Sequence, residues 1–369
     1  MQQVRIIIAG GGTGGHIFPA VAIGHALKRL RPVTELLFVG AKNKMEMEKI
    51  PQAGFSIKGL DIAGYNRSHL LSNITLPWKM LKSYLQAVKI LKEFKPDAVV
   101  GVGGYASFPV LYAAQRKNIP TLIQEQNSYA GKSNKILAKK AKAICVAYDN
   151  MNRFFPAHKL FVTGNPVRNV IAKNNLTREE GQLWLGLDPH KPTLLIVGGS
   201  LGAKSINEAI AEGIQALLDN GVQILWQTGK LFFETAQQLE SQYPKQVRVM
   251  DFIREMEYAY ACADVVVSRA GALAISELCI VAKPVVFVPY PYAAEDHQTS
   301  NAQSLVQKNA AVMVKDHETK KELVHQVIAL LQNKELQKSM HHNLKAMAIC
   351  DADEKIATKV FEIANSQVL

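Results

Sequence analysis

Residues 4–16, VRIIIAGGGTGGH, decide the fold of the first half of this chain. The apolar run is typical of a buried parallel strand, and the apolar spacing of residues 21–30 predicts a helix after the loop. Five glycines between positions 10 and 15 allow a tight turn and a close approach of the backbone. A glycine-rich turn into a helix presents backbone N–H groups to an anion. The stretch therefore predicts an α/β domain that holds a ligand, typically a phosphate, at this loop.

The same alternation of strand and helix recurs along the chain. Strand-like runs lie at 4–10, 35–40, 97–104, 120–126, 141–147, 159–166, 193–200, 222–229, 247–253, 264–271, 283–290 and 310–315. Strands separated by helices predict parallel sheets covered on both faces. Gly164 and Pro166 interrupt the pattern, so we predict two Rossmann-like, doubly wound domains that face a cleft. The first would span 1–165 and the second 166–349, with a last helix at about 350–369 packing back on the first.

The composition, 48% hydrophobic and 20% charged residues out of 369, is that of an ordinary globular protein. No apolar run is long enough to span a bilayer, and the N-terminus lacks a signal peptide, so we expect a cytosolic start. The formal net charge of +12 predicts an anionic partner: nucleic acid, a phosphate-rich ligand or an acidic membrane surface. Three of the four cysteines lie in apolar surroundings, which favours buried thiols. The Asp-X-Asp triplet at 351–353 is interpreted as solvated, so we predict no metal site.

A dinucleotide-binding fold is the obvious alternative for the first glycine loop. That fold needs an acidic residue at the end of the second strand to hold a ribose, and Gly40 and Lys42 stand there instead. The pattern therefore disfavours a nicotinamide or flavin cofactor. His16 has two interpretations, a structural residue of the turn or a general base, since imidazole titrates near neutral pH.

Two further loops of the first domain follow strands and should reach the same edge of the sheet. Gly103, Gly104 and Tyr105 belong to a second glycine loop, and two such loops suit a diphosphate. Glu125 and Asn127 follow the next strand. These two residues are placed for chemistry or for sugar hydroxyls, and a solvated helix cap at Glu125 is the alternative.

The second domain carries its own glycine loop, in which Ser200 can donate to a phosphate oxygen. A later strand is followed by the cationic Arg269 and by a helix start that suits nucleotide phosphates. Glu277 lies one to two turns into that helix, where a carboxylate can accept from both hydroxyls of a ribose. A polar cluster that includes Gln298 is suited to sugar hydroxyls.

Residues 70–95 combine a helical apolar stripe with basic residues. A helical spacing that predicts a core-facing stripe is seen at Leu81, Leu85, Val88 and Leu91, while Trp78 and the apolar residues before it lie among lysines and an arginine. An apolar tip with a basic surround is typical of a segment that rests on an anionic membrane. A hairpin packed on its own domain is the alternative.

Seven motifs resemble, in order, those of the MurG family of peptidoglycan glycosyltransferases: GGGTGGHIFPA, GVGGYASFP, EQN, GNPVR, GGSLGAKSIN, SRAGALAISE and EDHQTSNA. The resemblance runs from about residue 4 to residue 302. It implies a two-domain GT-B fold, no metal cofactor, and transfer of N-acetylglucosamine (GlcNAc) from UDP-GlcNAc with inversion. The acceptor would be the C4 hydroxyl of the muramyl sugar of undecaprenyl-linked lipid I. It also implies peripheral attachment to the cytoplasmic face of the plasma membrane, whose inner leaflet is anionic.

The resemblance assigns the donor to the second domain. Arg168 and Ser200 would contact its diphosphate, the backbone of Ile253 its uracil, and Gln298 its sugar. Contacts to ribose and phosphates are implied along one helix start, at Ala272, Leu273, Ala274, Ile275, Ser276 and Glu277.

The first domain would meet the lipid-linked acceptor, whose diphosphate is expected on the glycine loops. Residues that would border the donor sugar and the acceptor are Thr13, Gly14, Gly15 and Asn127. His16 is the first choice of base and Glu125 the second. Two rivals remain. The first is another enzyme of the same fold, a UDP-GlcNAc 2-epimerase or a different lipid-linked transferase, and the second is a basic nucleic-acid-binding protein. Because no nucleic-acid recognition motif is present, no nucleic-acid partner is predicted.

Overall fold

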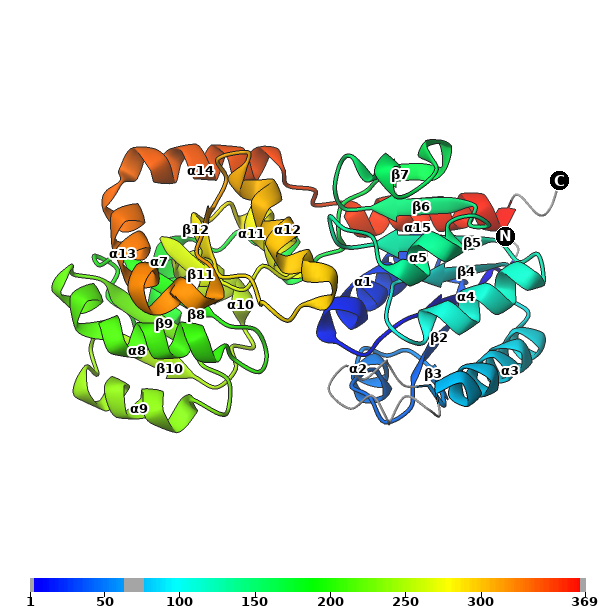
Figure 1. Ribbon diagram of the computed structural model, residues 1–369, viewed down its shortest axis with the longest axis horizontal. Coiled ribbons are helices and arrows are strands. Elements are labelled where there is room, and N and C mark those ends of the chain that lie inside the picture. The colour runs from blue at the N-terminus through cyan, green and yellow to red at the C-terminus, as the bar shows by residue number, and fades with distance from the viewer. Residues whose placement is uncertain (1–2, 63–75, 366–369) are drawn as a thin grey trace. The chain divides into compact units, whose positions relative to one another are not determined.

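The structure, a computed structural model, describes residues 3–62 and 76–365, so residues 70–75 of the predicted membrane segment lie outside it. The chain divides into two compact units, seen in Figure 1. Unit 1 comprises Met1–Arg168 and Asp351–Leu369, and unit 2 comprises Asn169–Cys350. The predicted boundaries after residues 165 and 349 lie three residues and one residue before the observed ones.

Unit 1 contains a parallel seven-stranded sheet with the order β3-β2-β1-β4-β5-β6-β7. Its strands are β1(Arg5–Ala9), β2(Glu35–Ala41), β3(Ile57–Leu60), β4(Ala98–Gly101), β5(Thr121–Glu125), β6(Ala143–Val146) and β7(Leu160–Val162). Its α-helices are α1(Gly14–Leu30), α2(Glu46–Gln52), α3(Leu76–Phe94), α4(Ser107–Arg116), α5(Lys132–Leu137) and α15(Ala352–Asn365). The strand order reverses between β1 and β4, which is the position where doubly wound sheets bind ligands.

Strand β1 is buried on both faces, as its unbroken apolar sequence predicts. Ile6 and Ile8 belong to a cluster that includes side chains of α1 and α15, whereas Ile7 belongs to a cluster with side chains of α3 and α4. Figure 1 shows α15, in red, running along the unit 1 sheet, where it contacts α1. Because Ile356 and Val360 of α15 are fully buried, this helix is part of the unit 1 core.

The start of α15 corrects the interpretation of the Asp-X-Asp triplet. Asp351 is exposed and pairs with Lys355, but Asp353 is only 5% exposed. Its carboxylate lies 2.9 Å from the guanidinium of Arg29 in α1. The prediction that the triplet is solvated is therefore wrong for Asp353, because the helix that carries it docks on α1.

Helix α3 is amphipathic, and its buried face matches only part of the predicted stripe. Leu91 is buried and Val88 packs against the core, as predicted, whereas Leu81 and Leu85 are 49% and 58% exposed. The prediction is wrong for Leu81 and Leu85, because helical spacing alone does not distinguish a stripe that packs on a sheet from one that faces outward. Ser83 and Ala87 are buried in their place. The small side chains of Ser83 and Ala87 mark the close-packed face.

Unit 2 contains a parallel six-stranded sheet with the order β10-β9-β8-β11-β12-β13. Its strands are β8(Thr193–Val197), β9(Gln223–Gln227), β10(Val247–Met250), β11(Val265–Ser268), β12(Val285–Phe287) and β13(Val312–Met313). Its α-helices are α6(Asn169–Ala172), α7(Arg178–Trp184), α8(Lys204–Asp219), α9(Phe233–Gln242), α10(Met256–Cys262), α11(Ala272–Val281), α12(His297–Val306), α13(Thr319–Gln332) and α14(Lys334–Ala346). Here the order reverses between β8 and β11, and such a reversal point is where doubly wound sheets typically bind ligands.

Each of the twelve predicted strand runs contains a strand, and the predicted doubly wound fold of both halves is confirmed. The sequence reasoning missed β3, a short edge strand whose sequence IKGL has no unbroken apolar run. Cys145, Cys262 and Cys279 are buried, as predicted, and burial raises the pKa of each thiol to about 12, whereas Cys350 is exposed. Among the described helices, none combines the length and the apolar character needed to cross a membrane.

Candidate active site

The two glycine loops of unit 1 follow the adjacent strands β1 and β4 and touch each other. The N–H of Gly11 donates to the carbonyl oxygen of Gly103 over 3.3 Å. A Cβ atom on Gly104, whose φ is +82°, would overlap the carbonyl oxygen of Gly11. Only glycine satisfies both the positive φ and the close approach at this position. The two loops therefore form one surface at the reversal point of the sheet.

His16 lies in the first turn of α1 and leans over the second loop. Its Nδ1 is hydrogen-bonded to the hydroxyl of Thr13 over 3.0 Å. A Cβ atom on Gly103 would lie 2.6 Å from Cδ2 and 2.8 Å from Nε2 of the imidazole. The absence of a side chain at Gly103 thus makes room for the ring. The hydrogen bond at Nδ1 fixes the orientation of a side chain whose other nitrogen is suited to proton transfer.

Glu125 ends β5 and is 4% exposed, so the alternative that it is a solvated helix cap is wrong. Its Oε1 accepts from the N–H of Asn127 over 3.1 Å. Its Oε2 accepts from the N–H of Gly131 over 3.1 Å and from the side chain of Asn134 over 2.8 Å. Burial raises the pKa of Glu125, and these hydrogen bonds oppose that rise. The carboxylate therefore organises the loop that carries Asn127.

A buried amide network, which the sequence reasoning missed, ties this loop to the second glycine loop. The side chain of Gln126 donates to the carbonyl of Val102 over 3.0 Å. Asn165 donates to the carbonyl of Gln126 over 3.0 Å and accepts from the side chain of Gln124 over 2.9 Å. The polar residues at the end of β5 gave no signal of these partners in the sequence, because the partners come from distant segments.

The remaining predicted residues of unit 1 lie around the same loops. Tyr105 is 48% exposed, and its ring lies 3.7 Å from the position of a Cβ atom on Gly12. Thr13 and Gly15 are exposed, and Gly14 begins α1. Arg168, the last residue of the first segment of unit 1, has its guanidinium 5.8 Å from the ring centroid of Phe18 in α1.

In unit 2, the glycine loop after β8 is exposed at Ser200 and leads into α8. The side chain of Gln227, the last residue of β9, is hydrogen-bonded to this loop. The Nε2 of Gln227 donates to the carbonyl of Gly199 over 2.9 Å, and its Oε1 accepts from the N–H of Ile253 over 2.9 Å. This single neutral amide links the predicted diphosphate loop with the predicted uracil contact, and the sequence reasoning did not identify it.

The predicted ribose residue, Glu277, lies in α11 and is 9% exposed. Its Oε2 accepts from the hydroxyl of Tyr260 in α10 over 3.0 Å. Tyr260 therefore orients the carboxylate, and it was missed because it belongs to a different helix. Along the same helix start, the hydroxyl of Ser276 donates to the carbonyl of Ala272 over 3.0 Å. Ile275 is 2% exposed, so only its backbone can meet a ligand; Leu273 and Ala274 are partly exposed.

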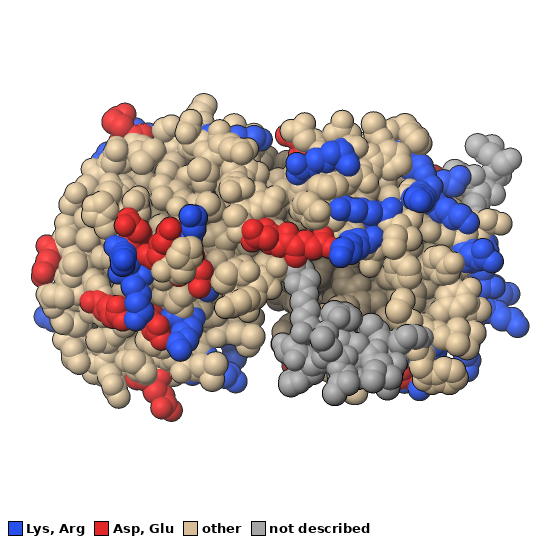
Figure 2. Space-filling model, viewed as in Figure 1, with Lys and Arg blue, Asp and Glu red and all other residues tan. Residues whose placement is uncertain are grey.

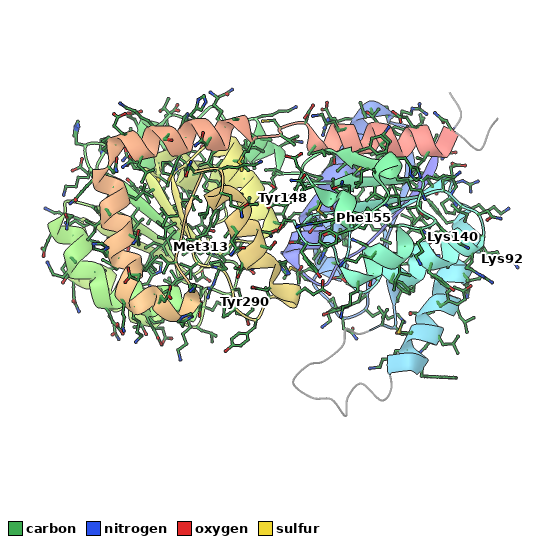
Figure 3. All side chains as sticks on the ribbon, turned by 45° about the horizontal axis from the view of Figure 1, so that its top comes forward. Lys92, Lys140, Tyr148, Phe155, Tyr290 and Met313 are labelled. Atoms are coloured by element: carbon green, nitrogen blue, oxygen red, sulfur yellow. The ribbon has the colours of Figure 1, made fainter. Side chains whose placement is uncertain are left out.

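Gln298 is the second residue of α12, and its side chain contacts the loop after β12. Its Oε1 accepts from the N–H of Tyr290 over 2.9 Å; Tyr290 is labelled in Figure 3. Arg269, the cationic residue that precedes the start of α11, donates to the carbonyls of Val288 and Pro289 and pairs with Asp316. Its guanidinium therefore links loops within unit 2. Across the described ranges, no group of three or more His, Cys, Asp or Glu side chains is arranged to hold a metal ion.

The comparisons with known proteins cover both units. Residues 6–146 match the N-terminal domain of glycosyltransferase family 28, and residues 193–356 match its C-terminal domain. A relative from Cytophaga hutchinsonii, named UDP-N-acetylglucosamine–N-acetylmuramyl-(pentapeptide) pyrophosphoryl-undecaprenol N-acetylglucosamine transferase, is 52% identical over 365 residues, 99% of this chain and 98% of the relative. A Phocaeicola vulgatus relative of the same name is 51% identical over 99% of this chain and 97% of its own length. The chain belongs to this transferase family.

Solved structures agree with membership in the transferase family. The crystal structure of Acinetobacter baumannii MurG has a TM-score of 0.80 and 31% identity, covering 97% of this chain and 99% of that one. A UDP-N-acetylglucosamine 2-epimerase has a TM-score of 0.65 at 14% identity, which shows a shared fold alone. The predicted two-domain GT-B fold is therefore confirmed.

Proposed function

We propose that this chain transfers GlcNAc from UDP-GlcNAc to the C4 hydroxyl of the muramyl sugar of lipid I, in peptidoglycan synthesis. The observation that carries the proposal is the 52% identity, over 99% of the chain, to a transferase with that name. The products are lipid II and UDP. The proposal includes no metal cofactor and no nucleic-acid partner, as the family resemblance implies.

Unit 2 is the donor side of this proposal. The loop at Ser200 and the N-terminus of the 16-residue helix α8 suit the diphosphate, because backbone N–H groups and the helix dipole favour anions. Glu277 suits the ribose hydroxyls and Gln298 the sugar. Since the N–H of Ile253 donates to Gln227, its carbonyl is the backbone group that we assign to the N3–H of uracil.

Unit 1 is the acceptor side. We assign Thr13, Gly14, Gly15 and Asn127 to the sugars, and Tyr105 to the rim of the same surface. An amide and a hydroxyl that are held by neighbouring loops suit sugar hydroxyls, which both donate and accept hydrogen bonds. Arg168 is kept as a predicted contact of the donor diphosphate.

The chemistry is one displacement at the anomeric carbon with inversion. His16 takes the proton from the attacking C4 hydroxyl as the new C–O bond forms, and the bond from the anomeric carbon to the UDP oxygen breaks. The N-terminus of α8, Ser200 and Arg168 stabilise the negative charge that develops on UDP. Glu125, the second candidate base, is instead assigned a positioning role, because its carboxylate is buried and hydrogen-bonded to the loop that carries Asn127.

Replacing Tyr260 with phenylalanine should raise the KM for UDP-GlcNAc about three- to tenfold, because one hydrogen bond that orients Glu277 is lost. The kcat should change little, since this contact acts on ground-state binding. Steady-state kinetics with the donor varied measures both parameters. Tyr258→Phe is the matched control on α10, since Tyr258 stacks on Trp184 rather than contacting Glu277. An unchanged donor KM in Tyr260→Phe would remove Tyr260 from the donor site.

We further propose that unit 1 attaches peripherally to an anionic membrane, at its cytoplasmic face, through the N-terminal half of α3. Trp78 is 72% exposed, and the exposed Leu81 and Leu85 continue its apolar surface along the helix. Figure 2 shows lysine and arginine side chains across the upper half and along the right-hand edge of the displayed face of unit 1. Lys82 is paired with Asp61, whereas Lys79, in the same half of the helix as Trp78, is exposed and has no ion pair with any described residue. Apolar insertion and an unpaired lysine together favour anionic lipid.

Trp78→Ala should weaken binding to vesicles that contain anionic phospholipid about tenfold, because an indole that inserts into the interface is lost. Co-sedimentation of the full chain with vesicles of phosphatidylglycerol and phosphatidylethanolamine measures the effect. Trp184→Ala is the control, since Trp184 is 49% exposed but belongs to unit 2. Equal binding by both variants would contradict a membrane role for α3.

The rival that shares the fold, a UDP-GlcNAc 2-epimerase, needs no acceptor. Incubation of the protein with radiolabelled UDP-GlcNAc, with and without a lipid I analogue, separates the two activities. We expect a labelled disaccharide product only when the analogue is present. Conversion of UDP-GlcNAc to its 2-epimer without the acceptor, and no disaccharide with it, would replace the proposal by the rival.

A further inference from the structure

Glu46, the first residue of α2, is an acidic residue at 1% exposure for which the proposed reaction has no role. Its Oε2 accepts from the N–H of Gly12 in the first glycine loop over 2.9 Å. Its Oε1 accepts from the N–H of Ala41 at the end of β2, also over 2.9 Å. A carboxylate of the chain itself therefore bridges the first glycine loop and the neighbouring strand.

Two glycines make room for this carboxylate. A Cβ atom on Gly11, whose φ is +140°, would overlap the carboxyl group of Glu46. A Cβ atom on Gly40 would lie 2.5 Å from Cγ of Glu46. In a dinucleotide-binding fold, glycines at such positions allow a phosphate to approach the backbone closely. In this chain they make room for a carboxylate, which is an anionic group like a phosphate.

The first half of the loop is consequently committed to contacts within unit 1. The N–H of Gly10 donates to the carbonyl of Val39 over 3.0 Å, and the N–H of Gly11 donates to Gly103. The N–H of Gly12 donates to Glu46. A diphosphate at these residues would have to displace the buried carboxylate or lie against its negative charge, and both are costly.

Unit 2 holds its glycine loop with a neutral group, which comes from the end of a strand rather than from the start of a helix. Its glycine loop is held by the carboxamide of Gln227, through a hydrogen bond to the carbonyl of Gly199. A neutral support leaves the loop suited to the donor's diphosphate. The two units thus carry similar glycine loops with supports of different charge, which is a physical basis for different ligands.

We propose that Glu46 is a specificity and positioning residue, a built-in anion that fills the anion position of the first glycine loop. The loop then presents residues 13–15 to neutral sugar groups, and the diphosphate of the acceptor does not bind at residues 10–12. This departs from the expectation that the acceptor's diphosphate lies on the glycine loops. The identity of the ligand as the lipid-linked acceptor rests on the proposed function, whereas the anion position does not.

Chemical rescue of Glu46→Ala tests the anion position. The substitution removes a carboxymethyl fragment whose shape acetate reproduces. In the full chain, we expect the variant to unfold at a lower temperature than the wild type, and acetate to raise its midpoint by about 2–4 °C above an equal concentration of sodium chloride. Acetamide, which is neutral and of similar shape, should have no such effect. Wild type and Glu48→Ala, whose carboxylate is on the surface of the same helix, should respond equally to acetate and chloride.

Equal effects of acetate and acetamide on Glu46→Ala, or an unfolding midpoint equal to that of the wild type, would overturn the proposal. Glu46→Gln keeps the volume of the side chain and provides a second measurement if the alanine variant does not fold. It should lower kcat about tenfold while the donor KM stays within twofold, because one N–H of the bridge loses its charged acceptor. A wild-type kcat for Glu46→Gln would contradict the positioning role. If the wild type forms no disaccharide, the proposed function fails, and the thermal measurements still decide the role of Glu46.

Discussion

His16→Ala is expected to lower kcat about a hundredfold or more, since a positioned general base contributes roughly 10²–10⁴-fold to the rate. The KM for UDP-GlcNAc should stay close to the wild-type value, because the donor is assigned to unit 2. The substitution leaves the glycine loops intact, since their mutual contacts run through the backbone of Gly11 and Gly103. Steady-state kinetics with a lipid I analogue measures both parameters.

His25→Ala is the matched control for this experiment. His25 is also in α1, but it is exposed and lies 4.8 Å from the ring of Phe55, away from the loops. Its loss removes an imidazole from the same helix and should leave kcat within about twofold, as for an ordinary surface substitution. If His16→Ala kept a kcat similar to that of His25→Ala, His16 would not be the base.

Gly103→Ala is expected to lower kcat about a hundredfold while His16 remains chemically intact, because displacement of a catalytic group by about 1 Å has an effect of this size. The new Cβ atom would stand 2.6 Å from Cδ2 of His16, so the imidazole must move. The substitution does not change the other close contact between the two loops, that of Gly104 with Gly11. Kinetics together with the thermal unfolding midpoint separates the loss of rate from the loss of stability.

Gly54→Ala provides the control for backbone strain. Gly54 has a φ of +85°, close to the +89° of Gly103, but nothing lies within 4 Å of its Cβ position. Both substitutions should cost about 1–2 kcal/mol in stability, because alanine is forced into a left-handed conformation. Only Gly103→Ala should also lower kcat, because only its new Cβ atom would contact His16. Equal kcat values for the two variants would show that the contact between Gly103 and His16 does not position the base.

The fold was accessible from the sequence because it depends on local patterns. Unbroken apolar runs such as the one at Ile6–Ile8 are buried on both faces of a parallel sheet, and the helices between them leave no other arrangement. Loops after β1, β4, β8 and β11 then reach the reversal points by topology alone. The positions of His16, Ser200 and Glu277 at the sheet edges follow from the same argument.

The parts that the sequence did not reveal depend on contacts between distant segments. A dinucleotide-binding fold would have an acidic residue that binds ribose at the end of β2, where Lys42 stands. In the structure, the acidic residue that contacts the first glycine loop is Glu46, at the start of α2. Tyr260 acts on Glu277 from another helix, and Glu125 is buried by a loop that folds over it. Leu81 was assigned to the core because periodicity gives the spacing of a stripe but not what it faces.

The central claim is transfer by a single displacement, and the anomeric configuration of the product tests it most directly. The protein is incubated with UDP-GlcNAc and a soluble lipid I analogue, and the coupling constant of the new anomeric proton is measured by NMR. The account predicts one product, a β-1,4-linked disaccharide on the muramyl C4 oxygen, because one displacement inverts the α-linked donor. An α-linked disaccharide, or a linkage to another hydroxyl, would contradict it.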